Sequence, residues 1–287
     1  MNKRKSLAEV HLAVLLFGVA GLFGKWLTFS PLTIVLGRVF FASITLAFLL
    51  KLTGQRFSIS PRKNYLALVL LGFILAIHWA CFFQSIQVAT VAVGLLSFST
   101  YPVFTTLLEP LLLKEKIIKM NFLLSLICLA GVSLIIPRFS LGHSTFVGVL
   151  WGLLSSLTFA LLTVLNRSLT QNLPSLLLAF YQDFFALIFL LPSCIVLQPV
   201  LNARDILLLI VLGVFCTAGS HSLFIDGMKR IKAQTASLIN TLESVYGIVF
   251  AFFLLREIPS LRTILGGVII LLSQAFIISE FFKKRKS

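Results

Sequence analysis

Residues 102–115 read PVFTTLLEPLLLKE, and residues 244–257 read SVYGIVFAFFLLRE. Both stretches have an aromatic third residue, both end in two leucines, a basic residue and a glutamate, and they lie 142 positions apart. Both belong to long apolar segments of the chain. A repeat of half the chain length inside a hydrophobic sequence is typical of transporters built from two related halves, with the binding site between them.

The amino-acid composition indicates a membrane protein. Of the 287 residues, 59% are hydrophobic and 11% are charged, against roughly 25% charged residues in an average soluble domain. A soluble chain of this length cannot bury so much apolar surface in a core. The formal net charge of +15 comes from short basic runs between apolar segments. No basic face with interleaved aromatic residues is present, so nucleic-acid binding is not expected.

Ten segments are long and apolar enough to cross a bilayer, which takes about 20 residues of helix. We therefore expect an all-α integral membrane protein with ten transmembrane helices, some of them starting at prolines such as Pro31 and Pro174. The ten expected spans are 8–27, 32–51, 64–85, 90–112, 121–137, 145–165, 175–197, 205–225, 234–255 and 260–281.

The basic residues predict how the helices are oriented. With the N-terminus placed in the cytoplasm, 18 of the 24 Lys and Arg residues fall in cytoplasmic segments and four in outer loops. The remaining two, Lys25 and Arg38, lie within spans or at their edges. This bias predicts cytoplasmic N- and C-termini in a multi-pass protein of the cell membrane, the inner membrane of a bacterium. The first span is too long, and lacks the cleavage site, for a removed signal peptide.

An odd number of spans in each half means that the second half enters the membrane in the opposite sense. We expect two inverted five-helix repeats, residues 1–141 and residues 142–287. Such a pair encloses a cavity with two nearly equivalent gates, which is the mechanical basis of alternating access. Further residues match at a spacing of 143: Pro31, Arg38 and Phe41 correspond to Pro174, Tyr181 and Phe184.

Two segments next to the repeated stretches resemble a known family. Residues 94–102, GLLSFSTYP, and residues 233–238, AQTASL, followed by TLE at 241–243, are similar to the fourth- and ninth-helix patterns of the EamA repeat. That repeat defines a large branch of the drug/metabolite transporter superfamily, whose members move amino acids, other metabolites and toxic compounds. The resemblance covers nearly the whole chain and implies a cavity lined mainly by helices 1, 3, 4, 6, 8 and 9.

The chain departs from the family pattern at one place in the ninth helix. The usual Glu-Pro is Glu243-Ser244 here. Because serine keeps the backbone N–H that proline lacks, we expect a straighter ninth helix than in relatives.

Ionisable residues in the hydrocarbon region are costly and are therefore candidates for function. Glu243 lies about nine residues into its span, roughly 14 Å deep at 1.5 Å per residue. Binding of a substrate amine, proton coupling and a structural hydrogen bond all remain open for it. Arg38 can hold a substrate carboxylate, or it can snorkel outward or pair with a carboxylate. Asp183 can likewise contact substrate, or it can have a structural role by pairing with a basic residue on the cytoplasmic side.

Two histidines, His78 and His221, lie deep in corresponding helices, the third and the eighth. A membrane histidine more often forms a hydrogen bond between helices, but a pair in related positions also favours a cavity lining. A metal site is not expected, since no carboxylate or thiolate shares their local spacing.

Aromatic residues and a proline complete the candidate site. Pro102 lies in the middle of its span, where it frees a backbone carbonyl and is a candidate bend or gate, with Pro110 and Pro192 as alternatives. The aromatic side chains expected to line a cavity for apolar or cationic cargo are Trp79, Tyr101, Trp151 and Tyr246. For Trp151 an anchoring role at the membrane interface is equally open.

The repeated glutamates, Glu115 and Glu257, fall at helix ends, where a carboxylate can cap the following helix. Inverted topology puts them on opposite sides of the membrane, so they cannot hold one substrate together. We expect structural roles for both. The four cysteines are expected to be buried thiols that form no disulfide, and they are Cys81, Cys128, Cys194 and Cys216.

The sequence contains none of the common catalytic or nucleotide-binding motifs, so we expect a secondary carrier without a cofactor. Its expected partners are the lipid bilayer and a small-molecule substrate, with proton coupling left open. Our first hypothesis is export of amino acids or related metabolites by alternating access. The alternatives are export of drugs or lipophilic cations and import of a metabolite. An intramembrane enzyme or scaffold is disfavoured, because neither a catalytic constellation nor an extramembrane binding surface is visible.

Overall fold

The computed structural model describes residues 3–59, 63–113, 119–231 and 233–283. These residues form a bundle of helices and contain no strand. The first half of the chain forms α1 (Lys3–Ala20), α2 (Phe23–Trp26), α3 (Pro31–Leu52), α4 (Lys63–Val88), α5 (Val91–Phe98), α6 (Tyr101–Leu113) and α7 (Lys119–Ile135). The second half forms α8 (Ser144–Leu169), α9 (Ser175–Leu197), α10 (Ala203–Gly213), the π-helix η1 (Val214–Gly219), α11 (Ser220–Gly227), α12 (Ala233–Asn240), α13 (Leu242–Leu255) and α14 (Leu261–Lys283).

Eight helical segments of the described residues are long and apolar enough to cross a membrane. They agree with eight of the expected spans to within a few residues: Lys5–Trp26, Pro31–Leu52, Asn64–Val88, Val91–Leu113, Ser144–Leu169, Ser175–Leu197, Ala203–Gly227 and Thr235–Leu255. The other two expected spans, 121–137 and 260–281, coincide with shorter apolar helices, Leu126–Ile135 and Leu261–Ser273. The number of ten spans therefore stays a prediction.

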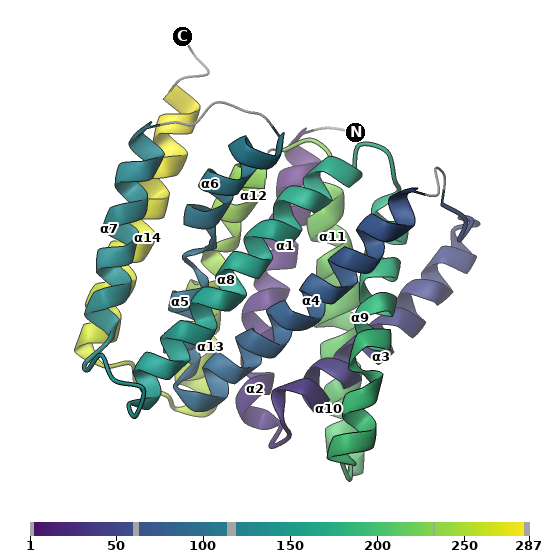
Figure 1. Ribbon diagram of the computed structural model, residues 1–287, viewed down its shortest axis with the longest axis horizontal. Coiled ribbons are helices and arrows are strands. Elements are labelled where there is room, and N and C mark those ends of the chain that lie inside the picture. The colour runs from purple at the N-terminus through teal and green to yellow at the C-terminus, as the bar shows by residue number, and fades with distance from the viewer. Residues whose placement is uncertain (1–2, 60–62, 114–118, 232, 284–287) are drawn as a thin grey trace.

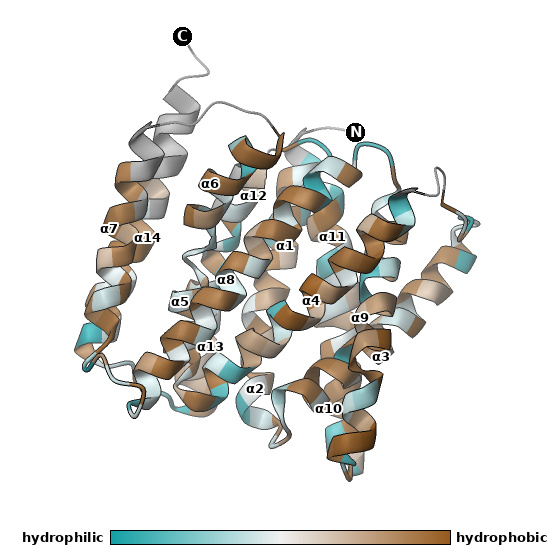
Figure 2. Cartoon of the chain, viewed as in Figure 1, coloured by the Kyte–Doolittle hydropathy of each residue, from teal (hydrophilic) through white to brown (hydrophobic). Residues whose placement is uncertain are grey.

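Large apolar side chains cover the outside of the bundle. Phe48, Leu66 and Phe253 are 60%, 76% and 72% exposed, and Figure 2 shows apolar residues along the outer helices, with hydrophilic residues gathered mainly near the two ends. Such a surface would aggregate in water but is the normal contact surface with lipid.

Local signals explain where several helices begin. The Ser30 hydroxyl accepts a hydrogen bond from the backbone N–H of Thr33, and Pro31 is the first residue of α3. The side chain of Thr90 caps α5 in the same way. Asn202 and Asp205 form a reciprocal capping box at α10. Each cap satisfies backbone N–H groups that have no partner within the helix.

Two of the spans are interrupted near their middle. The fourth breaks at Ser99 and Thr100, and Pro102 follows as the second residue of α6. Pro102 supplies no N–H, and its ring would clash in a continuous helix with the carbonyl of Phe98, four residues earlier, where α5 ends; this accounts for the break. The ninth span breaks at Thr241, although no proline is present there. Whether this span is nevertheless straighter than in relatives stays a prediction.

The two interrupted spans lie side by side and are joined by hydrogen bonds near their breaks (Figure 1). The hydroxyls of Ser99 and Ser244 are hydrogen-bonded to each other, and Ser244 also donates to the carbonyl of Leu95 at 2.8 Å. The Tyr101 hydroxyl donates to the carbonyl of Ser237. Each break thus finds partners in the other span.

The remaining helices surround this central pair. Helix α1 packs against α11 and α13, and α4 packs against α8 and α9. Helices α7 and α14 pack together at one edge of the bundle (Figure 1). Helix α1 begins and α14 ends at the same end of the bundle, which Figure 1 shows at the top.

The cysteine prediction needs one correction. Cys81, Cys128 and Cys216 are buried as expected, but Cys194 near the end of α9 is exposed. The expectation of burial is wrong there because the last turns of α9 turn their apolar side chains outward, with Ile195 and Val196 77% and 80% exposed.

Gly18 allows α1 and α13 to approach closely next to the centre of the bundle. A Cβ atom at Gly18 would lie 2.8 Å from the Cβ of Tyr246 and 3.2 Å from the carbonyl oxygen of Glu243. The first distance is shorter than any real Cβ contact, and a Cβ atom cannot rotate away. Small residues at such crossings are typical of membrane helices.

We expect Gly18→Ala to destabilise the protein by about 1–3 kcal/mol, because the added methyl group forces α1 and α13 apart. The measurement is thermal unfolding of the purified protein in detergent. Gly142→Ala is the matched control, since its Cβ would meet only the Ser140 hydroxyl at 3.7 Å. Equal stability of both variants would show that the close approach is not required.

Candidate functional site

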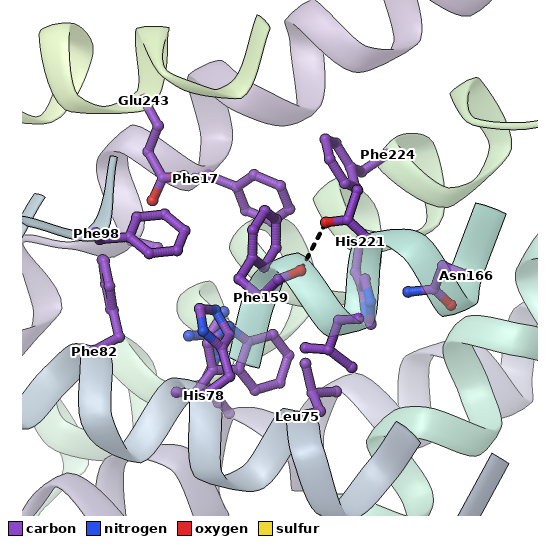
Figure 3. A pocket seen from close by; sticks show the side chains of 15 residues that line it. Phe17, Leu75, His78, Phe82, Phe98, Phe159, Asn166, His221, Phe224 and Glu243 are labelled. Carbon is purple, nitrogen blue, oxygen red and sulfur yellow. Dashed lines mark hydrogen bonds between the residues drawn. The ribbon is translucent and has the colours of Figure 1, made fainter. Parts of the chain in front are cut away.

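A narrow cavity of about 30 Å³ lies among the helices at the centre of the bundle. Figure 3 shows Glu243 at one side of it and His78 and Leu75 at the opposite side. The wall is mostly aromatic and aliphatic: Phe17, Ala20, Leu75, Trp79, Phe82, Phe98, Phe159, Leu162 and Phe224. The polar lining consists of Arg38, His78, Thr163, Asn166, His221 and Glu243.

The helices around the cavity agree with those that the family resemblance implied. Lining residues come from α1, α4, α5, α8, α11 and α13, which belong to the expected spans 1, 3, 4, 6, 8 and 9. Arg38 adds α3, the second span. An apolar cavity with a few convergent polar groups is the usual form of a small-molecule site.

Arg38 is fully buried, with 1% of its surface exposed. Its Nε donates to the Thr217 hydroxyl at 3.0 Å, and its Nη2 donates to the carbonyl of Cys216 at 3.3 Å. Both partners belong to η1, where the π-helical turn displaces the regular hydrogen bonds of the backbone. The guanidinium is therefore held within the cavity wall and does not snorkel outward.

Trp79 covers the guanidinium of Arg38. The Cζ atom of Arg38 lies 3.7 Å from the centre of the Trp79 ring, and the same ring meets His221 edge-on at 5.9 Å. A cation stacked on indole is stabilised by the negative face of the ring, and more strongly where water is excluded. Trp79 thus fixes the position of the one buried cation that lines this cavity.

Glu243 follows directly after the break in the ninth span and lines the cavity, with 5% of its surface exposed. Its Oε2 accepts a hydrogen bond from the Asn240 amide at 2.9 Å. Arg38 lies within electrostatic range of Glu243 and, more strongly, of Asp183. One basic and one acidic side chain therefore reach the same apolar cavity from different helices.

The two histidines have different surroundings. His78 Nδ1 lies 3.0 Å from both the carbonyl and the hydroxyl of Ser155, so it connects α4 to α8 as well as lining the cavity. His221 Nδ1 lies 3.7 Å from Asp183 Oδ2, which is ion-pair range but too long for a hydrogen bond. The structural partner near Asp183 is thus a histidine in the cavity wall and not the cytoplasmic base that we expected.

Other predicted residues lie behind the cavity or away from it. The Tyr101 ring packs against the rings of Phe98 and Phe159, with 4.9 Å between ring centres in each pair, so it supports the cavity wall from behind. Tyr246 faces α1 at Gly18, and Trp151 is 37% exposed on α8, in keeping with an interfacial position. Pro102 marks the break that brings Phe98 to the cavity, and whether it acts as a gate stays a prediction.

Sequence reasoning did not find several lining residues. Asn166 lines the cavity and exchanges two hydrogen bonds with Gln182, at 2.6 and 3.3 Å. Its signal was present, since an amide is unusual in an apolar span. The phenylalanines gave no signal, because 28 of them are spread through the chain.

Polar contacts tie the repeats together beside Lys25. Its Nζ donates to the carbonyls of Ala89 and Gln87 at 2.9 and 3.4 Å. Glu257 accepts hydrogen bonds from the N–H groups of Val91 and Ala92, both at 3.0 Å. Glu257 is thus a helix cap, as expected, but it caps α5 and not the helix that follows it. Its repeat partner, Glu115, lies outside the described residues.

A similar set of contacts involves Arg167 and Ala233, which lie 142 residues after Lys25 and Val91. Arg167 Nη1 donates to the carbonyl of Met228 at 3.2 Å, and Glu109 accepts from the N–H of Ala233 at 3.2 Å. In each set a basic residue binds one or two carbonyls at the end of one helix, and a glutamate binds the start of the next. Both are positions where backbone groups lack helical partners.

A multi-pass bundle of apolar helices around an enclosed, partly polar cavity is the architecture of a membrane transporter. Residues 7–136 and 146–279 each match the EamA-like transporter family, and the chain belongs to this family.

Named relatives are also transporters. An uncharacterized transporter of Bacillus subtilis (strain 168), YxxF, is 24% identical over 96% of this chain and 90% of its own. An S-adenosylmethionine uptake transporter of Rickettsia prowazekii (strain Madrid E) is 24% identical over 87% of this chain and 82% of its own. One solved crystal structure, 15% identical, has a TM-score of 0.73 over 100% of both chains. At that identity the likeness concerns the fold alone.

The two tyrosines of the site region provide a matched pair for a stability test. We expect Tyr101→Phe to lower the free energy of unfolding by about 1–3 kcal/mol, because the buried carbonyl of Ser237 loses its donor. Tyr246→Phe, at a half-buried position, should have little effect. Thermal unfolding in detergent measures both. A larger loss for Tyr246→Phe would mean that the contact between the interrupted spans is not what holds them together.

Proposed function

We propose that the protein is a secondary carrier of small zwitterionic metabolites, amino acids or related compounds, and that it works by alternating access. The observation that carries this proposal is the presence of Arg38 and Glu243 in one apolar cavity. A zwitterion offers a carboxylate to the first and an ammonium group to the second. Binding both groups together offsets the cost of holding two opposite charges in a dry site.

Arg38 is suited to receive the carboxylate. Its described hydrogen bonds use Nε and Nη2, and none of them uses Nη1. The contacts with η1 and the stacking on Trp79 fix the guanidinium before substrate arrives. A donor held in place costs less to order on binding than a flexible one.

The side group of the substrate would lie among the phenylalanine rings. Phe17, Phe98 and Phe159 form much of the wall between the two charged residues. Aromatic faces accept apolar groups and also cations. The relatives named for S-adenosylmethionine uptake support this class, because that compound combines an amino-acid group with a positively charged sulfonium.

For the membrane arrangement we propose ten spans in two inverted halves, residues 1–141 and 142–287, with both termini in the cytoplasm. The related contacts of Lys25 and Arg167 would then hold the outer and the inner side of the cavity closed. A carrier of this kind works in either direction, so the ion and substrate gradients decide between export and uptake. The relatives' names favour uptake as the second candidate.

Counterflow in proteoliposomes tests the function. We expect labelled L-methionine or S-adenosylmethionine to exchange against unlabelled compound through the purified protein. Glu243→Gln should reduce this exchange by about tenfold or more, because the attraction to the ammonium group is lost. Asp205→Asn is the control, a carboxylate in a helix cap outside the cavity. Normal exchange by Glu243→Gln would reduce Glu243 to a structural hydrogen bonder.

Labelling of a cavity cysteine tests the two gates. In a variant with alanine at the four native cysteines, Ala20→Cys would place a thiol in the cavity wall. We expect Lys25→Met to increase its labelling by an impermeant maleimide added outside, and Arg167→Met to decrease it. The loss of one hydrogen bond, about 1 kcal/mol, should change the ratio of outward-open to inward-open protein, and with it the labelling, roughly fivefold.

Lys51→Met is the control for this labelling, because Lys51 is exposed at the end of α3. Changes in the same direction for Lys25→Met and Arg167→Met would contradict opposite gates.

A further inference from the structure

Asp183 is a buried carboxylate that the proposed binding of a zwitterion does not use. Its surface is 0% exposed, and among the described residues neither Oδ1 nor Oδ2 has a hydrogen-bond partner. His221 Nδ1, the nearest charged or titratable atom, is also buried without one. Buried polar atoms without partners are rare and costly in proteins. Two of them, Asp183 Oδ2 and His221 Nδ1, face each other across 3.7 Å and require a physical explanation.

A proton shared between the two side chains would satisfy both of them. Either His221 donates Nδ1–H to the carboxylate or the carboxylic acid donates to Nδ1, and both arrangements give a hydrogen bond shorter than about 3.2 Å. At a separation of 3.7 Å, a small movement of either side chain would bring the two atoms within that range.

We propose that Asp183 and His221 together form the site of a transported proton, next to the substrate cavity. This inference rests on the proposed function, since a coupled proton requires a transported substrate. His221 lines the cavity and can exchange a proton with water there, whereas Asp183 is sealed behind it. The pair gains one positive charge when it takes up a proton from one side of the membrane and loses it on release to the other.

The charged and titratable groups around Asp183 are compatible with this role. Helices α3, α4 and α11 pack against α9. Arg38 on α3 interacts electrostatically with Asp183, but its described hydrogen bonds go to η1. His78 on α4 is bound to Ser155. Asp226 on α11 binds Ser175 and Lys229, about two helical turns from Asp183 along α9.

The remaining titratable groups of these three helices are more distant or neutral. Tyr65 lies beside Tyr181, Lys51 is at the end of α3, and Cys81 is a buried thiol. From α8 the neighbouring Asn166 is a neutral amide that exchanges hydrogen bonds with Gln182.

Arg38 couples this proton site to the substrate. In the empty cavity the guanidinium offsets the negative charge of Asp183. A substrate carboxylate bound to Arg38 neutralises part of that positive charge, so the Asp183–His221 pair then binds a proton more tightly. By linkage the proton tightens substrate binding by the same factor. Proton and substrate therefore move together, and an acidic exterior drives uptake.

Proteoliposomes with a pH gradient test this. With labelled L-methionine or S-adenosylmethionine, whichever shows counterflow, the wild-type protein should accumulate substrate when the exterior is more acidic. Asp183→Asn should lose this accumulation yet keep counterflow at equal pH. Glu243→Gln should lose both activities. Gradient-driven accumulation by Asp183→Asn at the wild-type level overturns the proton site, while absence of counterflow in the wild-type protein overturns the proposed carrier itself.

Proton uptake on binding gives a second readout that needs no variant. In weakly buffered detergent solution with a pH dye, the wild-type protein should take up protons on binding substrate, approaching one per molecule at a pH where the empty pair is mainly deprotonated and the substrate-bound pair is mainly protonated. Asp183→Asn should take up none while still binding. Gel filtration verifies that this variant is folded. If it does not fold, the wild-type measurement decides, and substrate binding without proton uptake at any pH overturns the proposal.

Discussion

The structure depends on how two interrupted membrane spans satisfy their own backbones. Hydrocarbon offers no hydrogen bonds, so each unpaired peptide group in a span costs several kcal/mol. Side chains of each interrupted span donate to backbone carbonyls of the other: Ser244 donates to the carbonyl of Leu95, and Tyr101 donates to that of Ser237. These hydrogen bonds hold the two breaks together at the centre. Phe98 and Glu243, which flank them, reach the cavity for that reason.

The same constraint applies to the charges. A guanidinium in the middle of a bundle is tolerated only where its donors and its face are occupied. For Arg38 the π-helical turn supplies an available carbonyl and a hydroxyl, and Trp79 supplies the face. The irregular backbone of the eighth span and the broken backbone of the ninth thus have a common consequence. Each places a polar side chain, Arg38 or Glu243, in the wall of the cavity.

The sequence predicts the helices better than it predicts the site. Spans follow from the length of apolar runs, and the break at Ser99 follows from Pro102, because both effects are local. The break at Thr241 has no local cause and depends on contacts with residues about 145 positions away. Arg38 stacks on Trp79, and Asp183 faces His221. Both contacts also join different helices, so local sequence does not predict them. Phe159 could not be distinguished from the other phenylalanines, since it lines the cavity only because of where α8 lies.

Residues that differ between the two repeats supply the charged groups of the candidate site, while residues that the repeats share account for their similar helices. At a spacing of 142, Tyr101 corresponds to Glu243: the tyrosine connects two spans, and the glutamate lines the cavity. At 143, Arg38 corresponds to Tyr181, which donates to the carbonyl of Phe57. The first half therefore contributes the cation, and the second contributes the carboxylates of Asp183 and Glu243. In the proposed inverted arrangement, the similar contacts at Lys25 and Arg167 would form the two gates. The residues that differ between the repeats would lie between these gates and form one site with a basic and an acidic side.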